Sequence, residues 1–301
     1  MELSVIVSTL NDRERLLSCL DALRERTPPS TEVIVVNGPS TDGTTGVVRE
    51  REDVDVLVEI SERNENVSRN AGLEASSGDA VAFVGDTYTV EPTWYDAVEV
   101  GIADGADVVT GPVASGNAGG DDQASPTRVA GRTVTHFHGN NVVFARPVLE
   151  ALDGFDEYLT VDGDRDCAHR AAELGFDVIW DGRMAVTPAV GTDGGRADRE
   201  WGESYRSLTY RLTKNYGPRP TVLARTMGSA LRDAVHGARA VAAGDRRPTT
   251  WFGDGLEVAK NAAGGFRDGV LARYLDRSPH RNPNGVSVRH DRAVRVYDRR
   301  S

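Results

Sequence analysis

Short runs of branched apolar residues recur along the first part of the chain, and each run is followed by a turn and a polar stretch. Such runs predict buried strands of a parallel sheet, and apolar residues at helical spacing between them predict amphipathic helices. The expected strands are Leu3–Ser8, Glu32–Val36, Val54–Ile60 and Ala80–Val84. The expected helices end near Arg26, Glu52 and Ala75.

Strands that alternate with helices predict right-handed βαβ units, and the fold class is therefore α/β. We expect residues 1–100 to form a doubly wound half-domain. The same pattern continues less regularly to residue 190 and contains a loop rich in Gly, Ser and Asp at Ala114–Thr127. The further expected strands are Asp107–Pro112, Thr133–Ala145, Asp177–Trp180 and Met184–Thr187, and the further helices are Pro92–Ile102, Pro147–Leu152 and Cys167–Leu174.

The pattern changes near residue 190. Residues 191–301 are expected to form a helical extension that ends in a polar, irregular tail, Ser278–Ser301. The pair Gly264-Gly265 marks a point where the last helix would divide in two, because glycine weakens a helix interior. The expected helices of the extension are Glu200–Asn215, Thr221–Ala243 and Asp254–Leu275.

The net charge and the residue composition limit which functions and cellular locations fit the chain. A net charge of −11 argues against a nucleic-acid binder that neutralises phosphates. Only Lys214 and Lys260 are lysines among 35 basic residues, and this acidic, lysine-poor composition is typical of salt-loving archaea. The two cysteines, Cys19 and Cys167, fit a reducing cytosol. We expect no signal peptide and no transmembrane helix, because the apolar runs are short. The expected location is cytoplasmic, with at most a peripheral membrane contact.

Asp86 is the first candidate for chemistry. It follows the apolar run Ala80–Val84, and an open α/β sheet binds its ligands at the carboxyl ends of its strands. A carboxylate there suits a metal-bound diphosphate. The alternative is an aspartate that caps a helix or forms a turn.

Six segments in order resemble the family 2 inverting glycosyltransferases, which have the GT-A fold, a Rossmann-type mixed sheet flanked by helices. The resemblance covers about residues 3–190 and implies a nucleotide-binding half, 1–100, and an acceptor half, 101–190. The segments are VIVSTLND (Val5–Asp12), VVNGPSTDGT (Val35–Thr44), NVSRNAGL (Asn66–Leu73), AFVGDTYTVEPTW (Ala82–Trp94), GNNVVFARPVLEALDGFDEYL (Gly139–Leu159) and GDRDCAHRAAELG (Gly163–Gly175).

The resemblance implies a nucleotide-sugar donor, with a UDP-sugar favoured, and Mg²⁺ or Mn²⁺ held by Asp86. The chain departs from the family pattern at three places. The aspartate that usually contacts the base is Asn37, the D-x-D motif is Gly85-Asp86-Thr87, and the glutamate of the E-D pair is Gly163. Metal use and base preference therefore stay open. The donor-binding residues implied are Thr9, Asn11, Asn37, Ser40, Asp42, Arg69, Asn70, Asp86 and Tyr88.

On the acceptor side the resemblance implies Asn140, Asn141 and Asp166, with Asp164 as the general base for an in-line displacement. Asp162 is the second choice for that base. The alternative for Asp164 is a helix N-cap. His136 and His138 suit phosphate or metal contact but are more commonly packing residues.

Haloarchaeal enzymes that resemble this chain extend glycans on dolichyl phosphate for surface-layer glycoproteins. The implied acceptor is thus a lipid-linked saccharide at the cytoplasmic membrane face. Three alternatives remain: a degenerate member that binds a nucleotide sugar without catalysis, a nucleotidyltransferase or dehydrogenase on a similar sheet, and a structural partner in glycan assembly. A basic membrane-facing surface is one further hypothesis, built on Arg206, Arg211, Arg219, Arg225 and Arg232.

Overall fold

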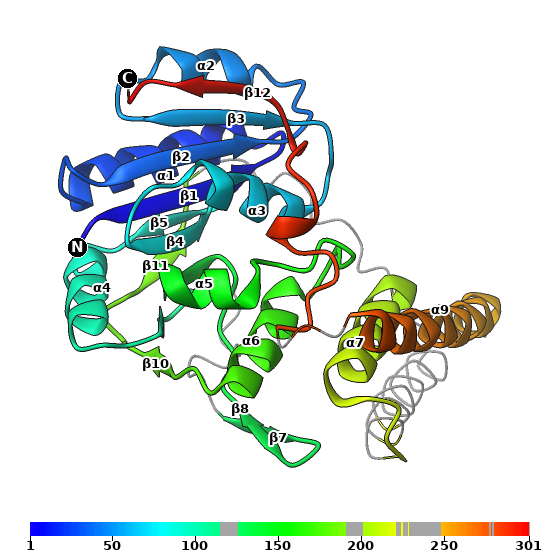
Figure 1. Cartoon of the computed structure of the whole chain (residues 1–301). Helices are drawn as coiled ribbons and strands as arrows, with labels where there is room; N and C mark the ends of the chain where they lie inside the picture. Colours follow the sequence, from blue (N-terminus) through cyan, green and yellow to red (C-terminus); the bar gives the residue numbers. More distant parts are fainter. Residues whose placement is uncertain are drawn as a thin grey trace. The chain divides into compact units, whose positions relative to one another are not determined.

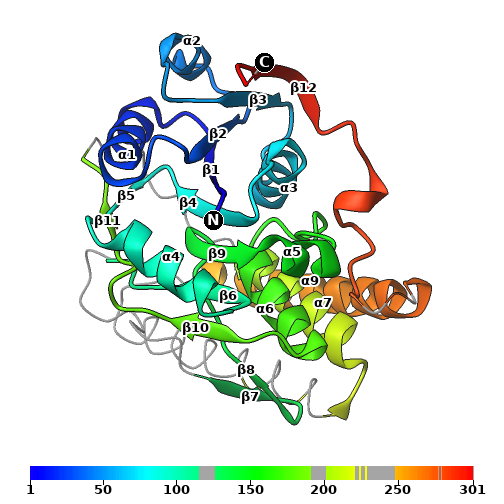
Figure 2. The same ribbon diagram turned by 60° about the vertical axis from the view of Figure 1, so that its left-hand side comes forward.

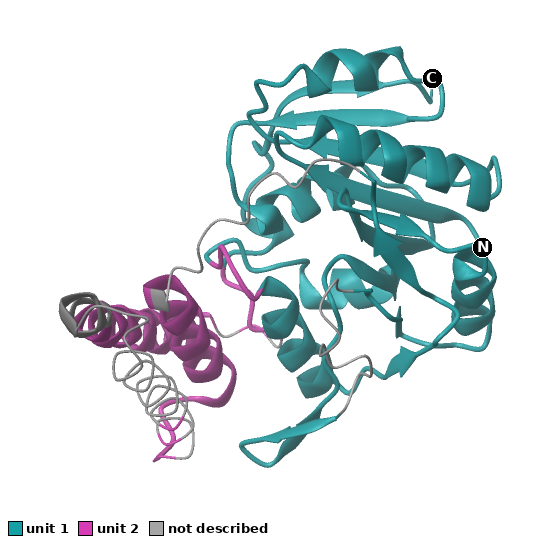
Figure 3. Cartoon of the chain, turned by 180° about the vertical axis from the view of Figure 1, so that it is seen from behind, with its two compact units in different colours: residues 1–158, 163–195, 284–301 teal, residues 159–162, 196–283 magenta. Residues whose placement is uncertain are grey.

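The structure is a computed structural model, and it describes residues 1–114, 126–190, 201–220, 224, 228, 248–276, 278 and 280–300. The chain forms two compact units, which Figure 3 distinguishes by colour. The first unit comprises residues 1–158, 163–195 and 284–301, and the second comprises residues 159–162 and 196–283. The expected helix at 221–243 lies outside the described residues except at 224 and 228, as does most of the loop expected at 114–127.

An eight-stranded mixed sheet forms the centre of the first unit, in the order β10-β6-β9-β4-β1-β2-β3-β12. Four strands from the N-terminal part pair in parallel, and β9 and β12 run antiparallel to their neighbours. The strands of this sheet are β1 (Leu3–Thr9), β2 (Glu32–Asn37), β3 (Val56–Ile60), β4 (Ala80–Gly85), β6 (Val108–Thr110), β9 (Asn141–Ala145), β10 (Val178–Trp180) and β12 (Ala293–Asp298). This confirms the expected α/β class with a mixed sheet.

Helices cover both faces of this sheet, and Figure 2 shows α1 and α3 on opposite sides of it. Alternate strand residues face alternate sides. Val5, Val7 and their equivalents on β2 pack with α1, whereas Ile6 packs against α3, where Gly72 allows close approach. The helices of the first unit are α1 (Arg13–Arg26), α2 (Thr44–Glu50), α3 (Glu65–Ala75), α4 (Trp94–Ala103), α5 (Arg146–Leu152) and α6 (Gly163–Leu174).

The C-terminal tail differs from expectation. The structure forms β12 inside Ser278–Ser301 and pairs it antiparallel with β3 at the edge of the sheet (Figure 1). The prediction of an irregular tail is therefore wrong. Its polar character reflects an edge position, because most β12 side chains remain exposed.

Smaller differences concern short elements. The expected strand Thr133–Ala145 is interrupted after Val134, and α6 begins at Gly163 rather than near Cys167. Two small paired sheets were not expected. They comprise β5 (Tyr88–Val90) with β11 (Val186–Pro188), and β7 (Thr127–Val129) with β8 (Arg132–Val134).

The second unit contains α7 (Trp201–Tyr216) and α9 (Pro248–Leu275), which pack together. α9 continues through Gly264-Gly265, so the predicted division does not occur. A β-carbon on Gly265 would lie 2.2 Å from the Arg206 carbonyl oxygen of α7. Glycine there permits close helix packing. Arg206 pairs with Asp268 at 2.8 Å and Arg211 with Asp162 at 3.6 Å, so neither guanidinium adds net charge to the proposed basic surface.

Candidate functional site

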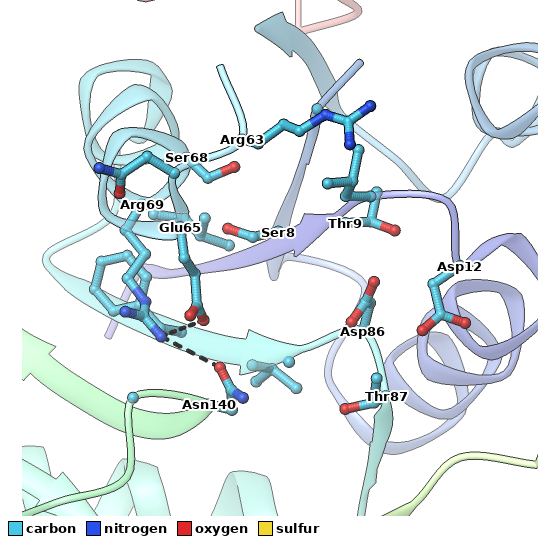
Figure 4. Close-up of a pocket in the computed structure, with 18 of the residues that line it drawn as sticks. Ser8, Thr9, Asp12, Arg63, Glu65, Ser68, Arg69, Asp86, Thr87 and Asn140 are labelled. Carbon is cyan, nitrogen blue, oxygen red and sulfur yellow. Dashed lines mark hydrogen bonds and ion pairs between the residues drawn. The ribbon is translucent and has the colours of Figure 1, made fainter. Parts of the chain in front are cut away.

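A pocket of about 280 Å³ opens at the carboxyl ends of β1 and β4 and at the start of α3 (Figure 4). This is the position at which open α/β sheets bind ligands. Four of the sequence-predicted residues line it: Thr9, Arg69, Asp86 and Asn140. The pocket therefore combines a carboxylate, a guanidinium and two polar side chains from four separate segments.

Asp86 lies in the turn between β4 and β5, and its carboxylate faces Thr9 across the pocket in Figure 4. Burial, with Asp12 and Glu65 nearby, raises the pKa of Asp86 to about 7. A bound cation would offset this by stabilising the charged form. The preceding residue has to be small, because a β-carbon on Gly85 would lie 2.9 Å from that of Asn140.

A divalent metal fits this site if the substrate supplies part of its ligands. No group of three His, Cys, Asp or Glu side chains suited to a metal occurs among the described residues. Mg²⁺ commonly takes one or two carboxylates and completes its shell with water and substrate phosphates. Asp86 suits that role when a diphosphate supplies the other oxygens.

Arg69 projects from α3 and is 5 % exposed. Its guanidinium donates to Asn66 Oδ1 at 3.1 Å and to Asn140 Oδ1 at 3.2 Å, and it pairs with Glu65. The helix start is defined by Asn64, whose side chain accepts from the Asn66 amide at 2.8 Å. Arg69 is thus held at the pocket wall near the positive end of a helix, where an anion is favoured.

Asp164 lies beside the pocket, in the first turn of α6. Its Oδ2 accepts a hydrogen bond from the backbone N–H of Gly139 at 3.1 Å, and Gly139 itself lines the pocket. A β-carbon on Gly139 would lie 2.6 Å from an Arg69 nitrogen and 3.1 Å from the Asp164 β-carbon. Glycine at 139 therefore allows the two charged side chains to approach one another.

His138 precedes this glycine, and its ring meets that of Tyr88 edge to face at 6.2 Å. Burial lowers the pKa of His138, with Arg69 acting in the same direction and Asp164 against it. His138 is therefore neutral near pH 7. Tyr88 lies beside His138 rather than in the pocket lining.

The loop after β2 bonds mainly to itself. The Asn37 side chain donates to Thr45 Oγ1 at 2.9 Å and accepts from Ser40 Oγ at 2.7 Å, and Asn37 is 1 % exposed. Asn11 joins the same loop by donating its backbone N–H to Ser40 Oγ at 2.9 Å. Asp42 accepts from the Thr44 hydroxyl at 2.6 Å. These four predicted residues shape the loop next to the pocket but do not line it.

The structure corrects the expected positions of three residues, which are bonded within the core instead of the pocket. Asn70 binds the backbone of Phe155 through both ends of its amide, at 2.9 Å each. Asn141 accepts from the indole N–H of Trp94 at 2.9 Å. Asp166 forms a fully buried ion pair with Arg170 at 2.8 Å.

Several pocket residues were not predicted from the sequence. Asp12 occupies the N-cap position of α1 without a side-chain capping bond; its carboxylate pairs with Arg15 and faces Asp86 in Figure 4. Glu65 and Ser68 lie near Arg69 on α3 and also line the pocket. The i, i+4 spacing to Arg69 is the signal that would have found Glu65, whereas Ser68 directly precedes Arg69 and no spacing rule points to it. Arg63 lies on the loop before the helix, where no spacing rule applies.

Residues 4–151 match the family model described as Glycosyl transferase family 2. These residues form a family 2 glycosyltransferase domain. The domain includes Thr9, Arg69, Asp86 and Asn140 of the pocket, and Asp164 lies beyond the matched range. The predicted family is thus confirmed.

Two curated relatives share part of this sequence. Glycosyltransferase AglE of Haloferax volcanii is 27% identical over 194 residues, which are 59% of this chain and 63% of AglE. Putative glycosyltransferase EpsH of Bacillus subtilis is 28% identical over 109 residues, or 35% of this chain and 32% of EpsH. The chain therefore spans less than two thirds of the length of either relative.

Solved structures share the fold. A mannosyltransferase, PcManGT from Pyrobaculum calidifontis in complex with GDP-Man and Mn²⁺, superposes with a TM-score of 0.58 at 20% identity and covers 92% of this chain and 88% of its own. S. aureus TarS 1-349 in complex with UDP-GlcNAc superposes with a TM-score of 0.62 at 17% identity. The match covers 91% of this chain and 92% of the TarS chain. The glycosyltransferase domain thus has the expected GT-A fold. No helix within the described ranges is both long and apolar enough to cross a membrane.

Proposed function

We propose that the chain transfers a hexose or hexuronic acid, with inversion, from a nucleotide sugar to an acceptor hydroxyl. One observation carries the proposal: Asp86 and Arg69 line a single pocket, and Asp164 contacts its rim at Gly139. A site with a cation-binding carboxylate, a fixed guanidinium and a nearby second carboxylate has the groups that the reaction needs.

The donor diphosphate would lie between Asp86 and Arg69. Asp86 would hold a divalent ion, which would supply charge neutralisation for the leaving phosphates. Arg69 adds a fixed positive charge, and its hydrogen bonds to Asn66 and Asn140 hold it in place. Donors fixed before the reaction stabilise charge that develops in the transition state more effectively than mobile ones.

Asp164 is the proposed general base. Its carboxylate accepts from the backbone N–H groups of Gly139 and Arg165, and these bonds orient it without blocking all of its lone pairs. It would take the acceptor proton as the hydroxyl attacks the anomeric carbon and the bond to the diphosphate breaks. Asp162 is the second candidate for this role.

The acceptor is proposed to be a saccharide on dolichyl phosphate, used for surface-layer protein N-glycosylation. Similarity to AglE and the acidic, lysine-poor composition support this. Such an acceptor requires at least peripheral contact with the cytoplasmic face of the membrane.

The test is sugar transfer in high KCl, with a panel of UDP- and GDP-sugars and dolichyl-phosphate glycans as acceptors. Product anomeric configuration, read by NMR, reports inversion. Transfer by the wild type that is lost in Asp164→Asn supports the proposal. A wild type that binds nucleotide sugar but transfers nothing to any of these acceptors would contradict it.

A second candidate function is nucleotide-sugar binding without catalysis, within a glycan-assembly complex. The specific observation in its favour is that Gly85 and Thr87 replace the flanking carboxylates of the family motif. Metal-dependent hydrolysis of the donor in the absence of acceptor separates the two, because a purely binding protein leaves the donor intact.

A further inference from the structure

The end of the chain returns to the first unit and crosses two of its loops. Residues 284–300, here called the C-terminal strap, contain the short 3₁₀ turn η1 (Val286–Val288) and β12. In Figure 1 the strap, in red, passes α3 on its way to the sheet edge beside β3. It is a late segment of the sequence bound to early ones.

The strap first binds the loop that follows α5. The backbone N–H of Val286 donates to the Asp153 carbonyl at 3.0 Å, and Ser287 donates to the Asp153 carboxylate through its hydroxyl at 2.8 Å. The N–H of Glu157 donates to the Asn284 carbonyl at 3.1 Å. Asp153 has a φ of 54°, a left-handed conformation that costs free energy unless its surroundings hold it.

Glu157 joins this loop to α3. Its side chain is 9% exposed and accepts from Asn70 at 2.8 Å, from Arg289 Nε at 2.8 Å and from Arg292. Its backbone carbonyl accepts from the Asn64 side chain at 2.8 Å. Asn64 both caps α3 and lines the pocket, so Glu157 connects the strap, through its carboxylate, to the pocket rim, through its backbone carbonyl.

Arg289 makes the second connection. Its NH1 lies 2.7 Å from Glu62 Oε1 while its Nε contacts Glu157, so one guanidinium bridges both carboxylates. Glu62 lines the pocket directly, next to Arg63 and Asn64. The hydrogen bond that Arg289 donates to Glu62, opposed by burial, raises the pKa of Arg289, which stays charged.

We propose that Arg289 is a positioning residue for the nucleotide-sugar donor. By bridging Glu62 and Glu157 it holds the pocket rim, residues 62–65, and the start of the helix that carries Arg69. If the rim is ordered before binding, less conformational entropy is lost when the ligand binds, and the affinity is higher. The inference rests on the proposed function, because it assumes that the pocket takes the donor.

The first readout is donor affinity and steady-state kinetics in high KCl, with UDP, GDP and their sugar forms in the presence of Mn²⁺. Because the pair is partly exposed, Arg289→Ala should raise Kd and the donor KM about three- to five-fold, with kcat changed less than about two-fold. Arg289→Lys should recover part of the loss, because it keeps the charge. Arg295→Ala is the matched control, an exposed strap arginine on β12, and should behave as the wild type.

The second readout needs no nucleotide. Amide hydrogen exchange over residues 61–69 should be faster in Arg289→Ala than in the wild type and in Arg295→Ala, while exchange in β4 should be equal in all three. An Arg289→Ala protein with unchanged rim exchange and unchanged Kd would overturn the inference. A wild type that binds no nucleotide would instead refute the proposed function, and the exchange result would still decide whether the strap orders the rim.

Discussion

The N-terminal halves of α3 and α6 carry comparable pairs of polar residues, and the two helices use them in the same way. In α3, Arg69 lines the pocket while Asn70 binds the backbone of Phe155. In α6, Asp164 contacts Gly139 at the pocket rim while Asp166 is buried against Arg170. Since successive helix residues point about 100° apart, neighbours in a motif face different surroundings. Each motif thus combines one residue at the pocket with one that is bonded within the core.

The largest expected effect that tests this comparison is at Asp164. If it is the general base, Asp164→Asn should lower kcat by about 10²- to 10⁴-fold. Stability should change little, because the asparagine side chain can still accept from Gly139. Transfer rates and thermal unfolding of the purified variant measure the two effects. An unfolded variant would show that Asp164 has a structural role. A folded variant with wild-type kcat would show that Asp164 is not the general base.

Asp166→Ala should lower the stability of the fold rather than act directly on kcat. It leaves the Arg170 guanidinium buried without its charge partner, which costs about 3–5 kcal/mol of folding free energy. Denaturant unfolding measures this loss. The Arg170 contacts to the carbonyls of Leu152 and Gly154, and its lesser electrostatic interaction with Asp156, would remain. A stable variant with impaired transfer would place Asp166 in the chemistry instead.

A smaller effect is expected at Asn70. Asn70→Ala removes the acceptor for the buried Phe155 N–H, at a cost of about 1–3 kcal/mol. The melting temperature should fall, whereas nucleotide affinity should stay within about two-fold of the wild type because the side chain does not reach the pocket. A large loss of affinity in a folded Asn70→Ala protein would remove the distinction between Arg69 and Asn70.

Most of the fold could be predicted from the sequence, since continuous apolar runs such as Val33–Val36 predict buried strands and are buried in the structure. β12 could not, because an edge strand pairs on one side only, and Val294 and Val296 remain exposed. The strand exists through its pairing with β3, which lies far away in sequence. The local pattern of apolar and polar residues does not reveal pairing with a strand that is distant in sequence.

The candidate site was predictable where one residue ends a strand. Asp86 follows β4, and strand ends fix the pocket edge. Asn141 and Asp166 could not be separated from their pocket-side neighbours, because that depends on strand and helix rotation in the folded unit. Asn37 matched the motif position but uses its amide within its own loop. Motif order thus located the site, and packing decided which side chains reach it.

The proposed donor site depends on Asp86, through which the pocket is expected to bind a metal–diphosphate complex. The most direct test is isothermal titration of the wild type and of Asp86→Ala with UDP, GDP and their sugar forms in high KCl, with and without Mn²⁺. We expect the wild type to bind one diphosphate in a metal-dependent way and Asp86→Ala to lose the metal dependence. Binding that ignores both the metal and Asp86 would contradict this expectation.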